Sequence, residues 1–99
     1  MTNENDLIER ERRGHRAKEF ANNPELVKAF KAVREAYLEG TTSCDPKDDR
    51  GRHNLVLAAV IVDKVRDHIG KIIQDGELAT RDLKEIRDQG KPRNILGIV

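Results

Sequence analysis

The stretch that decides the fold is residues 55–62, LVLAAVIV, where eight apolar residues follow one another without a charge. A run of this length suits either a buried strand or a buried segment of helix. Two alanines stand in its middle, and apolar residues continue at helical spacing as far as Ile73, which favours a helix. Because eight apolar residues cover every side of two helical turns, this helix needs neighbours all round.

A long helix over residues 46–75 is predicted around this run. Asp45 is a favourable N-cap, and Pro46 is tolerated in a first turn, where its missing N–H costs nothing. Gly76 is the residue type expected just past a helix end. The helix is therefore expected to stop at Asp75.

A second helix is predicted over residues 23–39, with Asn23 and Pro24 as the same start signal and Gly40 just past its end. Its larger apolar residues recur on one face, at Leu26, Phe30, Val33 and Tyr37. One face covers only one side of the long helix. We therefore expect an antiparallel hairpin of residues 23–39 and 46–75.

Flanking segments complete an expected all-α single domain, residues 1–99. Residues 4–21 predict a thin helix interrupted by Gly14, so residues 1–22 are expected to be weakly held. Residues 77–89 predict a short last helix, which completes a helical core over residues 23–89. Pro92 then makes residues 90–99 an extended arm with an apolar end.

Composition excludes several classes of protein. The 99 residues include 37% charged residues, 19 basic and 18 acidic, which gives a formal net charge of +1. No run is long enough to span a membrane, and the polar opening MTNENDLIERERR is no signal peptide. One cysteine allows no internal disulfide, so synthesis in a reducing cytoplasm is expected.

Metal binding is weakly indicated. Cys44 and His53 are too few for a zinc site, which needs about four ligands. Residues 45–51, DPKDDRG, do not form a calcium loop of the EF-hand type, because position twelve is Val56 instead of glutamate. We expect no metal, and instead a capping role for the three aspartates at 45, 48 and 49.

The sequence contains no catalytic motif. His68 has nearby aspartates, but the chain has one serine, Ser43, and no glycine-rich phosphate loop. We therefore expect no enzymatic activity and no cofactor, with His68 at the border of the apolar stripe.

Binding to proteins is the best-supported expectation. Contiguous apolar surface on a small chain usually marks an interaction site. The expected partner-binding residues are Leu55, Val56, Leu57, Val60 and Ile61 on the long helix, and Ile95, Leu96, Ile98 and Val99 at the end. The end either folds back on its own chain or docks on another protein. A second copy of the same chain is an alternative partner.

Nucleic-acid contact is the alternative, through Arg10, Arg12, Arg13 and Arg16. Glutamates at positions 9, 11 and 19 dilute this positive charge, and backbone affinity depends on uncompensated positive charge. A small packaging or regulatory factor would use these arginines.

The chain also resembles short proteins encoded in tailed-bacteriophage genomes. The resemblance lies in Tyr37–Leu38, Asp45–Arg52, Val65–Ile69 and Asp75–Ala79, within about two-thirds of the chain. It implies a phage origin and a place among virion-morphogenesis proteins, but no functional residues. We therefore expect a non-enzymatic structural or assembly protein that is made in the host cytoplasm, enters the virion and contacts capsid, portal or tail proteins. A host-directed inhibitor would use the same apolar surfaces.

Overall fold

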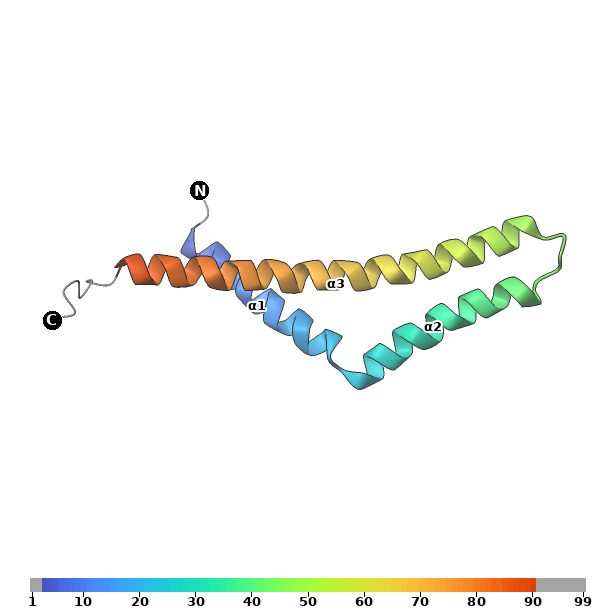
Figure 1. The fold of residues 1–99 in the computed structure, drawn as a ribbon, viewed down its shortest axis with the longest axis horizontal. Helices are drawn as coiled ribbons and strands as arrows, with labels where there is room; N and C mark the ends of the chain where they lie inside the picture. The colour runs from blue at the N-terminus through green and yellow to red at the C-terminus, as the bar shows by residue number, and fades with distance from the viewer. Residues whose placement is uncertain (1–2, 91–99) are drawn as a thin grey trace.

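The computed structural model describes residues 3–90, and this part of the chain consists of three α-helices joined by two short connections, without a strand. Figure 1 shows the three helices: α1 (Glu4–Ala21), α2 (Pro24–Ser43) and α3 (Asp49–Gly90). The expected all-α class is confirmed. With 42 residues α3 is about 63 Å long, so it sets the length of a molecule that measures 77 × 29 × 20 Å.

The two shorter helices lie one after the other along α3 (Figure 1). α1 runs antiparallel to α3, since Leu7 packs near Leu83 and Gly14 lies against Gly76. The chain then bends away at Asn22–Asn23, and α2 returns to the first half of α3, where Gly40 meets Leu55. The three helices thus outline a triangle with α3 as its longest side.

The prediction that the long helix ends at Asp75 is wrong. Residues 49–90 form one helix, so the separate helix expected over residues 77–89 is its second half. Apolar and small residues explain this continuity, because they alternate in steps of three and four along the whole length of α3. They are Leu55, Ala58, Val62, Val65, Ile69, Ile72, Gly76, Ala79, Leu83 and Ile86. Such a heptad pattern keeps these residues on one stripe of the helix over many turns.

Three glycines expected to interrupt or end helices lie inside helices at their contacts. A Cβ on Gly14 would lie 2.7 Å from the Cα of Gly76, so only glycine allows the two backbones to approach this closely. A Cβ on Gly40 would lie 3.0 Å from a methyl carbon of Leu55. The predicted end of α2 at Gly40 is therefore wrong, and that helix continues to Ser43.

The buried core is small and lies mainly at the α1–α3 crossing. Leu7, Ala79 and Leu83 form one buried cluster, and Ala59 is the fourth buried hydrophobic residue of the described chain. The radius of gyration is 21.9 Å, against about 13 Å for a compact domain of this length. Most apolar side chains therefore keep part of their surface in water.

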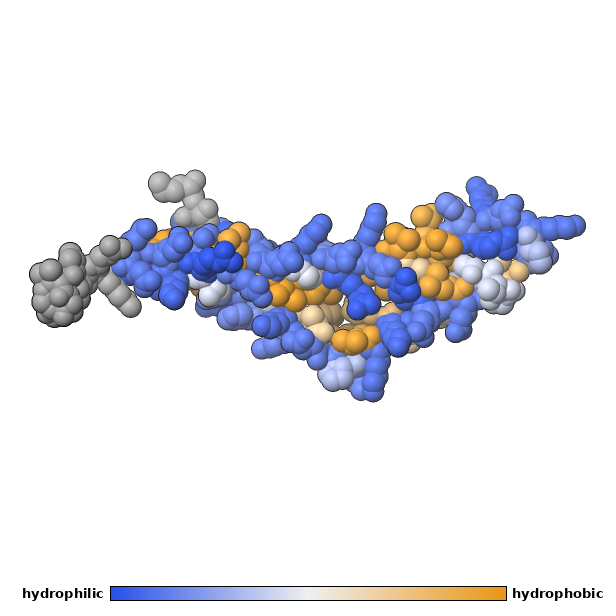
Figure 2. Space-filling model, in the orientation of Figure 1, coloured by the Kyte–Doolittle hydropathy of each residue, from blue (hydrophilic) through white to orange (hydrophobic). Residues whose placement is uncertain are grey.

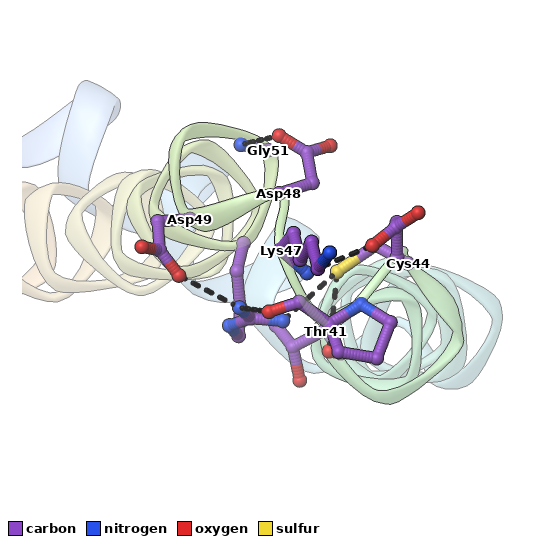
Figure 3. Close-up of polar contacts among 9 residues, drawn as sticks. Thr41, Cys44, Lys47, Asp48, Asp49 and Gly51 are labelled. Carbon is purple, nitrogen blue, oxygen red and sulfur yellow. Dashed lines mark hydrogen bonds and ion pairs between the residues drawn. The ribbon is translucent and has the colours of Figure 1, made fainter.

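The connection between α2 and α3 is held by local hydrogen bonds (Figure 3). Asp45 accepts a bond from the Lys47 N–H at 2.8 Å, and Asp48 accepts one from the Gly51 N–H at 2.9 Å. Asp49 pairs with Arg52 at 3.0 Å. The expected capping and pairing roles are confirmed for Asp48 and Asp49. The prediction that Asp45 caps the long helix and that the helix starts at Pro46 is wrong, because α3 begins at Asp49 and Asp45 bonds within the turn before it.

Candidate interaction surface

Four exposed apolar side chains form a patch on the first half of α3. Val56, Leu57, Val60 and Ile61, called here the α3 patch, are all exposed, and Ile61 retains 59% of its surface. Figure 2 shows apolar residues over this half of the helix. Leu55, grouped with them from the sequence, is instead half-buried beside Gly40 of α2.

The patch is exposed because α2 covers one side of α3 only. Ala59 is buried, and Asp63, one turn later, accepts a hydrogen bond at 2.9 Å from Arg34 of α2. Leu57 and Ile61 are each two residues from Ala59, so they lie on nearly the opposite side of the helix. The structure therefore leaves the run LVLAAVIV with one covered side, although its sequence is apolar all round.

A cavity of about 560 Å³ opens where the chain bends between α1 and α2. Its apolar lining comes from all three helices, through Phe20, Leu26, Phe30, Ile69 and Ile73. Three charged residues of α3, Asp63, Arg66 and Asp67, also line it. This cavity was not predicted from the sequence, although the Asn23–Pro24 break between two apolar faces was its signal.

The arginines of α1 have different environments. Arg10 donates three hydrogen bonds to Asp75, from Nη2 to Oδ1 at 2.8 Å and from Nε to Oδ2 at 3.0 Å and to Oδ1 at 3.2 Å. These bonds lower the pKa of the Asp75 carboxyl and raise the pKa of the Arg10 guanidinium. Arg12, Arg13 and Arg16 are exposed. Arg10 therefore contributes to the α1–α3 contact, and the other three remain candidates for an external ligand.

The candidate metal and catalytic residues are not brought together. Within residues 3–90, no three His, Cys, Asp or Glu side chains are grouped so that they could hold a metal ion. Cys44 is half-buried, with its thiol 3.3 Å from the carbonyl oxygen of Thr41 and 3.5 Å from Arg52 (Figure 3). His68 is exposed on α3.

The second half of α3 carries two further exposed apolar residues, Leu78 and Ile86. The expected partner residues Ile95, Leu96, Ile98 and Val99 lie outside the described residues.

Over residues 3–90, none of the helices combines the length and apolar character needed to cross a membrane. Among known proteins, the chain matches no family model, no curated protein and no solved structure.

Proposed function

We propose that the chain is a non-enzymatic structural or assembly protein of a tailed-phage particle that binds other proteins through α3. One observation supports the binding role: four apolar residues of one α3 segment are exposed, while the described chain buries four hydrophobic residues in total. Such a surface on a small chain is typical of an interaction site. The phage context rests on the sequence resemblance.

In this proposal, α2 and the first half of α3 act as an antiparallel hairpin that presents the α3 patch. α2 supports the hairpin from the opposite side through Arg34–Asp63 and Gly40–Leu55. The patch itself then remains available to capsid, portal or tail proteins.

The C-terminal residues would be a separate contact. Ile61 and Gly90 are 29 residues apart in one helix, or about 44 Å. The nine residues that follow Gly90 span at most about 30–32 Å when fully extended. Residues 91–99 therefore do not reach Ile61 of their own chain.

The test is the protein content of purified particles. We expect mass spectrometry of particles from the encoding phage to detect the chain at a fixed copy number. Replacing Leu57→Asn and Ile61→Asn together, or deleting residues 93–99, should reduce this copy number severalfold. The matched control, Lys28→Gln with Lys31→Gln on exposed positions of α2, should leave it unchanged. Particles that lack the wild-type chain would overturn the virion role.

A nucleic-acid-associated factor is the second candidate, favoured by the exposure of Arg12, Arg13 and Arg16. A gel shift at low salt that weakens steeply as salt rises would support it. The absence of any shift at low salt would remove it.

A further inference from the structure

We propose that the α3 patch binds an amphipathic helix of another protein, one whose apolar middle is flanked by acidic residues. This inference rests on the proposed use of α3 as an interaction surface, and it names the chemistry of the partner. The evidence is the charge on the same side of α3 as the patch, because exposed bases precede and follow the apolar residues there.

These bases extend the α3 patch in both directions along the helix. Steps of three and four residues connect Arg50 to Leu57 before the patch centre and Ile61 to Lys71 after it, which keeps the whole series on one side of α3. The bases, all of them exposed and called here the basic stripe, are Arg50, His53, Lys64, His68 and Lys71.

The acidic residues near the basic stripe are mostly held by other side chains. Asp49 pairs with Arg52, and Asp63 and Asp75 bond to arginines of α2 and α1. Asp67 lies at the edge of the stripe and lines the cavity beside α2. Within residues 3–90, none of the five bases of the stripe is in an ion pair. A surface that approaches the α3 patch therefore meets positive charge at both ends of it.

Neither neighbouring helix covers the basic stripe. α2 packs on the side of α3 where Ala59 is buried, and α1 packs beyond the end of the stripe, against Gly76 and Leu83. The stripe runs for 21 residues of one helix, from Arg50 to Lys71, or about 32 Å. A second helix of three heptads has this length.

A helix with acidic ends is the partner that matches this order of residues. Side chains at heptad spacing offer holes into which apolar side chains of a second helix insert, so its middle would pack on the α3 patch. Acidic residues towards its two ends would then face Arg50 at one end and Lys64 and Lys71 at the other. Opposite charges around an apolar centre fix the register of such a contact and speed association.

A membrane surface matches the same residues less well. A helix that lies on a membrane carries its bases on the polar face, away from the apolar face that enters the lipid. Here Lys64 and Lys71 follow the patch on its own side of α3, so they would be directed into the lipid together with Leu57 and Ile61. Nucleic acid also matches less well, because the exposed apolar side chains would then lie against phosphates.

A pair of designed peptides tests the inference. The acidic probe is a fluorescently labelled helical peptide of three heptads, with leucines on one face of the middle heptad and glutamates on the same face of the outer heptads. The lysine probe differs only in having lysines in place of these glutamates. We expect fluorescence anisotropy with the purified chain to show binding of the acidic probe, and binding of the lysine probe that is weaker on the order of tenfold.

Reversing charges on the chain should reverse this preference. Lys64→Glu with Lys71→Glu should weaken binding of the acidic probe on the order of tenfold and strengthen binding of the lysine probe. Lys28→Glu with Lys84→Glu is the matched control, since it changes the net charge equally at exposed positions outside the stripe, and it should keep the preference of the wild type. Circular dichroism verifies that all variants remain helical.

Failure of the acidic probe to bind, equal binding of the two probes, or an unchanged preference after Lys64→Glu with Lys71→Glu would overturn the inference. Three other assays would overturn it by naming another occupant. They are cosedimentation with phosphatidylserine vesicles or a dimer in sedimentation equilibrium, each abolished by Leu57→Asn with Ile61→Asn, and a gel shift of duplex DNA abolished by Lys64→Glu with Lys71→Glu.

These outcomes are independent of the particle experiment. A chain that binds the acidic probe as expected but is absent from particles would contradict the proposed function alone. A chain that is present in particles but does not distinguish the two probes would contradict the inferred partner alone.

Discussion

α3 is held by two helix contacts of different construction. At its crossing with α1, Gly14 and Gly76 bring the backbones together, and Leu7 and Leu83 beside them keep only 1% of their surface exposed. Along α2, the helices meet at Gly40 and Leu55 but separate towards the bend, where the cavity opens. As a result, α2 contains no buried residue.

The comparison shows that burial here depends on how closely two helices approach more than on how apolar each helix is. α2 has the larger set of apolar residues, including Val27, Val33 and Tyr37, which remain exposed. α1 has fewer apolar residues, but small residues at its crossing with α3 allow Leu7 to be buried. Side chains at a contact set the distance between helix axes, and that distance decides what is buried.

Truncating a leucine should therefore cost most at the crossing. We expect Leu83→Ala to lower the free energy of unfolding by about 2–4 kcal/mol, because it leaves a cavity in the buried cluster. Leu38→Ala on α2 removes a half-buried side chain and should cost about half as much. Urea unfolding followed by circular dichroism, at one protein concentration, measures both. Equal losses would contradict the contrast between the two contacts.

Adding a single methyl group sharpens the same comparison. In a helix, Gly→Ala normally stabilises by up to about 1 kcal/mol. Gly76→Ala should instead destabilise by about 1–3 kcal/mol, because its Cβ would lie 2.6 Å from the Cα of Gly14. Gly70→Ala is the matched control, since a Cβ at Gly70 meets no atom within 4 Å. A gain in melting temperature for both variants would show that α1 and α3 can move apart at Gly76 without loss of stability.

The sequence was sufficient to predict the helical class and the start of α2, although α3 begins at Asp49 and not at the predicted Pro46. Asn23 caps α2 as predicted, accepting bonds from the N–H groups of Glu25 and Leu26, and Pro24 follows in the first turn. These signals are local, because a cap and its target N–H lie within three residues of each other. Patterns of this kind can be recognised without knowledge of the rest of the fold.

The glycines could not be interpreted from local signals. A glycine ends a helix when its backbone turns, but it continues a helix when another backbone lies against it, and the second condition depends on a distant segment. Gly14 and Gly76 are 62 residues apart, so neither position reveals the other. The heptad spacing through Gly76 was the available sign that α3 continues.

The exposed residues were partly predictable. One neighbouring helix cannot cover a helical segment that is apolar on every side. The exposed α3 patch was therefore predicted from the sequence. The cavity at the bend was missed, because it depends on the angle at which α1 and α2 leave α3. That angle follows from the Gly14–Gly76 contact and the Asn22–Asn23 bend together.

The smallest expected effect concerns the ion pair at the crossing, and it depends on pH. Arg10 lowers the pKa of Asp75 from its ordinary value of 3.8, chiefly through the hydrogen bonds to its carboxylate. In the unfolded chain this pairing is absent, so the folded state favours the ionised carboxylate. The resulting stability is present above pH 3.8 and is lost as the pH falls through the lower pKa of the folded state. It is modest, because both side chains are partly exposed.

Melting temperatures of the wild type and of Arg10→Gln, measured from pH 7 down to pH 2, test this assignment. We expect the variant to melt lower at pH 7, and the difference to shrink below about pH 4 as Asp75 becomes protonated. Arg12→Gln removes an exposed arginine of the same helix and should follow the wild type throughout. A difference that stays constant to pH 2 would mean that Arg10 supports the crossing by packing its aliphatic stem rather than by pairing with Asp75, because packing does not depend on the protonation of a carboxylate.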